Sequence, residues 1–351
     1  MTISADEPIE LRSDNAAGVA PEMLAALAAA DSGSALAYGG DAISARLRDL
    51  VRETFDHGTA EVFPVVSGTA ANSLALSAMC PPWGSVLCHE TAHIFANEGG
   101  ATSLFSGGAV MRGLPGTDYK LQPASVQRAF EATNWGDPHH SQPSVVSVTC
   151  PTDFGTLYTP AEVAALAGVA STRGLRMHLD GARFANAIVA LACAPADLTC
   201  AAGVGAFSLG ATKNGALSTD AIVCFDPAVS EQLVYRLKRS GHVASKMRYQ
   251  SAQLVAYLTD DLWLRLARRA NDAMAQLSDG LRGLGVELLA EPQANMLFAR
   301  VGEPAAEALA VDRVLFYGMG NGVVRFVTSF QSTGEQMTEV LRRVQQVLSR
   351  R

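Results

Sequence analysis

The sequence predicts an α/β protein with a large domain built on a mainly parallel β-sheet and a smaller α+β domain at its C-terminal end. Short apolar segments alternate with helix-like segments through the middle of the chain, as strands and crossover helices do in a parallel sheet. These segments are continuously apolar, which indicates strands covered on both faces. The pattern changes after about residue 228, and 351 residues suffice for about two domains of roughly 150 residues each. We therefore expect a large domain at 1–228, including an N-terminal arm, and connecting helices with the small domain at 229–351.

Strand and helix signals follow one another through the large domain. The segment 61–68, EVFPVVSG, is a predicted strand, and a helix of small residues follows at 69–79. The segment 159–174 is a predicted helix because Thr159 can cap its first turn and Pro160 suits its first position. The other predicted elements here are strands at 84–90, 144–150, 175–180, 205–211 and 220–225 and a helix at 182–192. Beyond them we expect long helices at 228–258 and 260–284, strands in VELLA, NMLFARV and VVRFVTSF, and a final helix from about Gly334.

Composition and charge exclude several classes of protein. The net charge of −7 argues against a nucleic-acid partner. No segment approaches the ~18 consecutive apolar residues that cross a membrane, and the acidic, polar start MTISADEPIEL is not a signal peptide. The six cysteines form no C-x-x-C motif and are expected to be free thiols in a reducing compartment. We expect a soluble cytoplasmic protein without a metal site. Its low content of charged residues, 17%, suggests a subunit interface.

Polar residues stand where the predicted strands end. Ligands of open parallel sheets bind beyond the carboxyl ends of the strands, so these residues are the candidates for a site. They are Ser67-Gly68-Thr69, His89 to His93, Asp153, Asp180 with Arg183, and Thr212-Lys213.

The segment SGTAAN, from Ser67, follows a strand and opens a helix. Its glycine and small side chains let backbone N–H groups approach an anion, and the helix dipole adds to the attraction, so a phosphate fits there. An ordinary Ser/Thr helix cap has the same pattern and is the more frequent explanation for such a segment alone.

Lys213 lies between glycines in GATKNGA, directly after an apolar strand. A tight apolar setting disfavours the ammonium form, which lowers the pKa and leaves an amine that attacks carbonyls. A solvated surface loop is the alternative. Asp180 at its strand end could hold a pyridinium nitrogen, and Arg183 could bind a phenolate or a carboxylate. An Asp180–Arg183 ion pair or an Asp helix cap is the alternative there. Together these features meet three demands of one molecule, pyridoxal 5′-phosphate.

Eight motifs give the chain a resemblance to the threonine aldolases, fold-type I enzymes that depend on pyridoxal phosphate and have the aspartate aminotransferase-like fold. The motifs are LRSDNAAG, YGGD, SGTAAN, HETAHIFANEGGA, HLDGARFANA, LGATKNGA, KMRYQSAQ and VVRFVTSF. They extend from Leu11 to about Phe330, and HLDGARFANA is the most specific of them. Many pyridoxal phosphate enzymes share SGT and the lysine loop. Within the family, the chain is most similar to the bacterial low-specificity L-threonine aldolases and L-phenylserine aldolases.

The resemblance assigns roles to individual residues. It implies three catalytic residues: Lys213, which binds the cofactor covalently, Asp180, which pairs with the pyridine nitrogen, and His93, which stacks on the ring. It implies that Ser13, Arg183 and Arg325 bind the substrate carboxylate. The implied cofactor-binding set is Ser67, Gly68, Thr69, His93, Asp180, Arg183, Thr212 and Lys213, with Lys238 and Arg248 reaching the phosphate of a neighbouring subunit. Without the resemblance, His93 would be taken as a core histidine and Arg325 as a surface charge.

The implied reaction is cleavage of L-3-hydroxy-amino acids (L-threonine, L-allo-threonine, L-3-phenylserine) to glycine and an aldehyde. The expected assembly is a homodimer or homotetramer with the active site at the subunit interface. Asp153 and Ser329 stand where many threonine aldolases have histidines, and ASKMRYQ also departs from the usual Gly-rich segment. The group that takes the β-hydroxyl proton therefore stays open between His93 and water, with His89 a weaker candidate.

Three other functions are weighed against the aldolase. A pyridoxal phosphate-dependent β-eliminating lyase acting on an aromatic or hydroxy amino acid would use the same cofactor-binding residues. A dinucleotide oxidoreductase is disfavoured because GVGAFSLG lacks the third glycine at the required spacing and GMGNG runs into a strand. A non-catalytic cofactor-binding protein would lack the lysine or the aspartate, and both are present.

Overall fold

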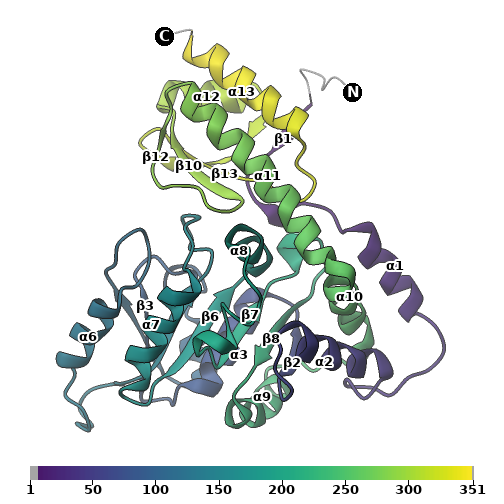
Figure 1. Ribbon diagram of the computed structural model, residues 1–351, viewed down its shortest axis with the longest axis vertical. Coiled ribbons are helices and arrows are strands. Elements are labelled where there is room, and N and C mark those ends of the chain that lie inside the picture. Colours follow the sequence, from purple (N-terminus) through teal and green to yellow (C-terminus); the bar gives the residue numbers. More distant parts are fainter. Residues whose placement is uncertain (1–6, 350–351) are drawn as a thin grey trace.

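The computed structural model of the chain describes residues 7–349 and contains one large sheet with a smaller lobe above it (Figure 1). The large sheet has seven strands in the order β2-β8-β7-β6-β5-β3-β4. All neighbouring pairs from β7 to β4 are parallel, whereas β8 is antiparallel to both of its neighbours. The expected mainly parallel sheet is therefore confirmed. Its strands are β2 (Glu61–Val65), β3 (Gly84–His89), β4 (Val110–Leu114), β5 (Gln142–Thr149), β6 (Arg176–Gly181), β7 (Ala206–Leu209) and β8 (Asp220–Cys224).

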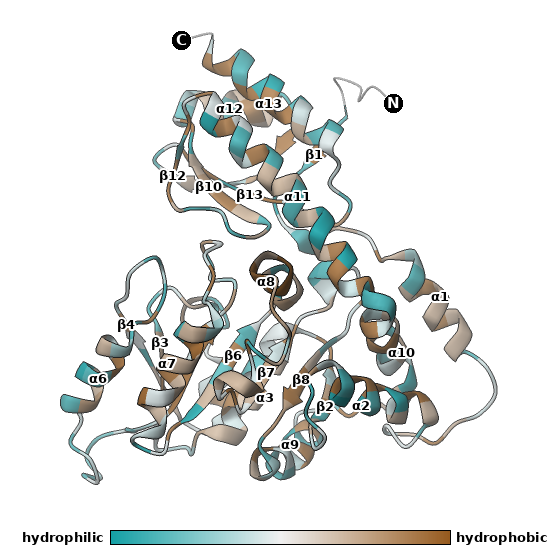
Figure 2. Cartoon of the chain, in the orientation of Figure 1, coloured by the Kyte–Doolittle hydropathy of each residue, from teal (hydrophilic) through white to brown (hydrophobic). Residues whose placement is uncertain are grey.

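Helices cover both faces of this sheet, which explains why its strands are apolar throughout. Adjacent residues of one strand enter different cores, since Leu87 belongs to one buried cluster and Val86 to another. One face carries α3 and α9, and the other carries α2, α6, α7 and α8; α8 is hydrophobic along most of its length (Figure 2). The helices are α1 (Pro21–Ala30), α2 (Ala42–Thr54), α3 (Gly68–Met79), α4 (His93–Ala96), α5 (Ala101–Ser106), α6 (Pro123–Glu131), α7 (Pro160–Ser171), α8 (Phe184–Leu191) and α9 (Pro227–Arg239).

The smaller lobe contains an antiparallel sheet of four strands in the order β12-β13-β10-β9. Its long helix α11 (Leu262–Gly283) runs up from the large lobe (Figure 1). The N-terminal β1 (Ile9–Glu10) pairs in parallel with β11 (Val314–Leu315), so this end of the arm packs in the core of the smaller lobe. The remaining elements are α10 (Arg248–Leu258), β9 (Glu287–Leu288), β10 (Met296–Arg300), α12 (Glu303–Val311), β12 (Tyr317–Gly320), β13 (Val323–Val327) and α13 (Gly334–Leu348). The domain boundary at 228 stays a prediction.

The helix expected at 228–258 is wrong, because two helices occupy this segment. α9 ends at Arg239 and α10 begins at Arg248. Gly241 has φ of 80°, a conformation that a helix does not accept and that glycine adopts without a steric cost. Lys238 and Arg248 consequently stand on different helices.

None of the helices in the described range 7–349 is both long and apolar enough to cross a membrane. Each of the six cysteines is a free thiol, and four of them are buried.

Candidate active site

The carboxyl ends of the parallel strands surround one cleft, as expected. Seven predicted residues line it together: Ser67, Gly68, Thr69, His93, Asp180, Thr212 and Lys213. Asp220 reaches the same edge because antiparallel β8 begins where its neighbours end. The sequence did not identify Asn15, Val66, Asn72, Glu98, Ala182 and Asp220, which complete the lining.

The N-terminus of α3 forms one end of the cleft. Ser67 caps the helix by accepting a hydrogen bond of 3.2 Å from the N–H of Ala70. A Cβ at Gly68 would point into open space, so a ligand can approach the backbone there. In the same lining, Asp220 accepts hydrogen bonds from the N–H groups of Ala211 and Thr212 at 2.7 and 3.0 Å. The buried hydroxyl of Thr212 has no partner within the part of the chain described. A helix N-terminus facing an unpaired hydroxyl suits a phosphate.

Lys213 lies half-buried in a short 3₁₀ helix, η3 (Thr212–Asn214). Burial, together with the nearby positive charge of Arg183, lowers the pKa of the Lys213 ammonium, although three carboxylates oppose this. The amine is therefore more nucleophilic toward a carbonyl than an exposed lysine would be.

Asp180 ends β6 and is 2% exposed. Its Oδ1 accepts hydrogen bonds from the N–H of Ala182 at 3.0 Å and from the hydroxyl of Ser208 at 3.3 Å. The next residue must be glycine, since a Cβ at Gly181 would lie 2.4 Å from the carbonyl oxygen of Ser208. The chain thus holds a buried carboxylate at the place where a pyridinium needs one.

Arg183 pairs with Asp14, and the alternative pairing with Asp180 is wrong. Its Nε and Nη2 donate to the two oxygens of Asp14 at 2.6 and 2.9 Å. Asn295 also donates to Asp14, at 3.0 Å, and to the carbonyl of Thr328 at 2.7 Å. Burial alone would raise the pKa of Asp14, but the charge and hydrogen bonds of Arg183 outweigh it and lower the pKa. Asp14 therefore joins the N-terminal arm, the large sheet and the smaller lobe.

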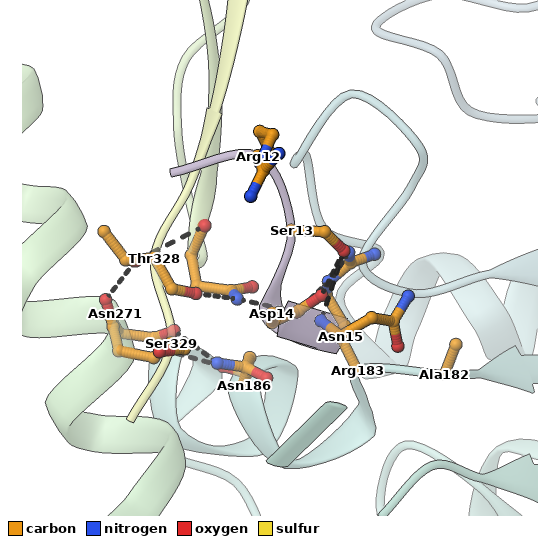
Figure 3. Close-up of polar contacts among 12 residues, drawn as sticks. Arg12, Ser13, Asp14, Asn15, Ala182, Arg183, Asn186, Asn271, Thr328 and Ser329 are labelled. Carbon is orange, nitrogen blue, oxygen red and sulfur yellow. Dashed lines mark hydrogen bonds and ion pairs between the residues drawn. The ribbon is translucent and has the colours of Figure 1, made fainter. Parts of the chain in front are cut away.

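Arg325 approaches the same region from β13. Its Nη2 donates to the carbonyl of Arg12 at 3.2 Å, and its guanidinium lies 5.1 Å from the centre of the Tyr317 ring. Its buried Nε has no partner among residues 7–349. Burial, and then the charge of Arg183, lower the pKa of Arg325. Two arginines whose positive charges repel each other favour an anion between them. The nearby Ser13 accepts a hydrogen bond from the N–H of Asn15 at 3.2 Å (Figure 3).

His93 begins α4, and its side chain is 38% exposed to the cleft. Its Nδ1 lies 3.0 Å from Oε1 of Glu98, and its N–H donates to Asp153 at 2.9 Å. The hydrogen bond to Glu98 raises the pKa of His93. Burial raises the pKa of Asp153 to about 6, and the charge of Asp180 adds to the effect.

Three other predicted residues lie away from this cleft or are engaged elsewhere. Lys238 Nζ lies 4.6 Å from the centre of the Tyr38 ring. Arg248 lines a separate hollow and donates to the carbonyl of Gly33 at 3.4 Å. His89 binds the hydroxyl of Thr91 at 2.8 Å, which is the strand-end hydrogen bonding that the sequence favoured for it.

The residues in the cleft fit pyridoxal phosphate. Within residues 7–349, the unpaired Thr212 hydroxyl, the buried Asp180 and the lysine with a lowered pKa, Lys213, supply what its phosphate, its ring nitrogen and its aldehyde require. The seven-stranded sheet, with its single antiparallel strand beside the lysine loop, is the sheet of the fold-type I enzymes. The protein is therefore a fold-type I enzyme whose cofactor is pyridoxal 5′-phosphate.

Comparison with known proteins identifies the family. Residues 10–304 match the beta-eliminating lyase family, and the chain belongs to it. A low specificity L-threonine aldolase from Pseudomonas sp. is 40% identical over 346 residues, which cover 98% of this chain and 99% of that protein. The threonine aldolase structure from Leishmania major is 26% identical with a TM-score of 0.88, covering 96% of this chain and 98% of that one. A serine palmitoyltransferase from Sphingomonas wittichii shares the fold at 14% identity and a TM-score of 0.74, over 99% of this chain and 89% of that one. The resemblance to threonine aldolases is confirmed, and the protein is a pyridoxal phosphate-dependent lyase.

Proposed function

We propose that the protein cleaves L-3-hydroxy-amino acids, among them L-threonine, L-allo-threonine and L-3-phenylserine, to glycine and the matching aldehyde. The observation that carries the proposal is the 40% identity with a low specificity L-threonine aldolase over 98% of the chain. The geometry supports it, because a candidate base, His93, lines the cleft with Lys213, and the charge of Arg183 acts on Lys213.

The carboxylate of the amino acid binds to Arg183, Arg325 and Ser13. Asp14 already occupies two donors of Arg183, which fixes its guanidinium and leaves the other edge for the substrate. Arg325 adds its unpaired Nε within the described chain. A carboxylate held by two arginines has a defined orientation, which decides where the Cα substituents point.

Pyridoxal phosphate, when bound, supplies the electron sink for the bond that breaks at Cα. Lys213 holds the cofactor covalently, and Asp180 keeps its ring nitrogen protonated. Ser67, Gly68, Thr69 and Thr212 hold the phosphate, and the ring of His93 covers the pyridine face.

The β-hydroxyl proton goes to His93 or to a water that His93 holds. Removal of this proton lets the Cα–Cβ bond break, and Cβ leaves as the carbonyl carbon of the aldehyde. Cα then receives a proton, and glycine is released. His93 is half-exposed to the cleft, and the hydrogen bond that its backbone N–H donates to Asp153 fixes its place at the start of α4.

Discrimination at Cα is expected to be strong and discrimination at Cβ weak. Inverting Cα displaces the carboxylate from its two arginines and leaves charges unpaired, which costs far more than a misplaced methyl group. The Cβ side has no comparable pair of charged anchors.

Steady-state rates on four substrates test the proposal. L-threonine, L-allo-threonine and L-3-phenylserine should yield glycine, and D-threonine should not. Cleavage of the D isomer, or of a single β-epimer, would contradict the proposed anchoring.

A β-eliminating lyase is the second candidate, favoured by the family that matches residues 10–304. Such an enzyme would release the β-substituent and form ammonia and a 2-oxo acid from an aromatic or hydroxy amino acid. Product analysis separates the two candidates, because only the aldolase forms glycine.

We also infer a homodimer or homotetramer whose active site lies at the subunit interface. Lys238 and Arg248 stand outside the cleft of their own chain, and we infer that they serve the phosphate of a neighbouring subunit. Exposed Leu36 and Tyr38 lie beside them and supply apolar contact surface. A reducing cytoplasm suits the six free thiols.

A further inference from the structure

Glu98 is a buried carboxyl group at the wall of the cleft, and the roles proposed above do not include it. Its side chain is 1% exposed and lies in the segment after α4. Its Oε1 is 3.0 Å from Nδ1 of His93 and accepts a hydrogen bond of 3.0 Å from Nδ2 of Asn72 on α3. A carboxyl group buried this deeply needs a specific partner.

The two contacts of Oε1 decide which nitrogen of His93 carries a proton. An amide nitrogen such as Nδ2 of Asn72 only donates, so Oε1 is an acceptor. The other oxygen, Oε2, has no partner among residues 7–349. An ionised Glu98 can only accept, so Nδ1 of His93 is the donor to it in that state. The neutral ring then keeps its lone pair on Nε2.

The other charged groups that act on His93 are Asp153 and Asp180, and Lys213 lines the same cleft. Asp153, after β5, accepts the N–H of His93, and Asp180 comes from the end of β6. A ring nitrogen of His93 and one carboxylate oxygen each of Glu98 and Asp180 lie within 4.8 Å of one another. The hydrogen bond to Glu98 is the largest influence raising the pKa of His93, burial opposes it, and Asp180 and Asp153 add smaller contributions.

We propose that Glu98 is the positioning residue of His93: it fixes the tautomer with Nδ1 protonated and directs Nε2 to the cleft as the acceptor of the β-hydroxyl proton. The proton-transfer part rests on the proposed function, whereas the tautomer is a property of the chain itself. In the transfer, the O–H bond breaks and an N–H bond forms at Nε2. The oxygen's electron pair completes the aldehyde C=O bond, and the electrons of the Cα–Cβ bond remain with Cα until a proton binds there. Glu98 stabilises the imidazolium that forms.

Nitrogen NMR of histidine-labelled protein tests the tautomer directly, on the full chain with and without cofactor. The His93 signals are identified by their loss in His93→Gln. When the His93 ring is neutral, at a pH above its pKa, the unmodified protein should show Nδ1 protonated and Nε2 bare. A bare Nδ1 in the unmodified protein would overturn the proposal, and this measurement needs neither a variant of Glu98 nor catalytic activity.

Glu98→Gln and Glu98→Ala separate charge from geometry. Gln keeps an acceptor for Nδ1 but removes the negative charge, so the tautomer should persist while the His93 titration moves to lower pH. Ala removes both, and the tautomer preference should disappear. In the holoenzyme, kcat should fall about tenfold or more with little change in KM, and the acidic limb of the pH profile should follow the NMR titration.

Asp137→Asn is the matched control, because Asp137 makes the same contact to Nδ1 of His140 at 3.1 Å on the surface. It should leave the His93 titration and turnover unchanged. A His93 titration identical in Glu98→Gln and the unmodified chain would refute the role of Glu98. If the unmodified holoenzyme shows the expected His93 tautomer by NMR but cleaves no L-3-hydroxy-amino acid, the proposed function is refuted and the role of Glu98 in fixing the tautomer is retained.

Discussion

Removing the carboxylate of Asp14 should destabilise the protein far more than removing an ordinary surface carboxylate. Asp14 and Arg183 have side chains that are 1% and 14% exposed, and two hydrogen bonds of 2.6 and 2.9 Å join them. Breaking a buried ion pair by deleting one partner costs about 3–5 kcal/mol, because the other charge stays buried. Coulomb's law agrees, giving about 4 kcal/mol for charges about 4 Å apart at an effective dielectric constant of about 20.

We therefore expect Asp14→Ala to lower the free energy of unfolding by about 3–5 kcal/mol. Asp14→Asn should lower it less, because its amide oxygen still accepts one bond from Arg183. Urea unfolding of the protein without cofactor measures both values. The control is Glu53→Gln, whose exposed partner Arg46 lies 3.4 Å away, and it should cost less than about 1 kcal/mol.

The pH dependence gives an independent check. Arg183 holds the pKa of folded Asp14 below its ordinary value, so the unfolded chain binds the proton more readily. The stabilisation is complete above the unfolded pKa of about 3.9 and is lost as the pH falls through the lower folded value. Asp14→Asn should remove this acid-sensitive part. If the free energy of unfolding of Asp14→Ala is within about 1 kcal/mol of that of the unmodified chain, Asp14 does not hold the N-terminal arm to both lobes.

Three further predictions concern activity and assembly. Asp180→Asn should keep the cofactor bound but lose at least about 100-fold in kcat, or roughly 2.7 kcal/mol of barrier, and near-normal rates would contradict its pairing with the ring nitrogen. The pKa of His93 is raised above 6.5, so kcat/KM for L-threonine should rise as the pH passes through a value above 6.5. A rise in kcat/KM that is already complete below pH 6.5 would argue against His93 as the acceptor. Sedimentation at assay concentration should give a dimer or tetramer, and Arg248→Ala should weaken cofactor binding; a fully active monomer would exclude a shared site.

Local patterns in the sequence were sufficient for the elements that position the site. The apolar strands are continuous because helices cover both faces, and Thr159 caps α7 in a capping box with Glu162, as its sequence indicates. Ser67, Asp180 and Lys213 could be identified because the ends of parallel strands meet at one edge. Each of these inferences depends on residues close together in the chain.

Contacts between distant residues were not predictable in the same way. Asp14 meets Arg183 across 169 positions, and nothing in LRSDN indicates that its aspartate has a buried arginine as partner. Glu98 stands in the glycine-rich segment NEGG, which resembles an exposed loop, and only the packing of α3 against it reveals its burial. The break between α9 and α10 depends on Gly241, whose positive φ is a property of the folded chain.

The attachment of the cofactor to Lys213 is tested most directly by borohydride reduction. The purified holoenzyme is reduced and digested, and mass spectrometry locates the modified peptide. We expect a single pyridoxyl adduct on Lys213, because this lysine has a lowered pKa and lies in the cleft with Asp180. Lys213→Ala should give no adduct and no turnover. An adduct on another lysine, or one that persists in Lys213→Ala, would contradict the assignment.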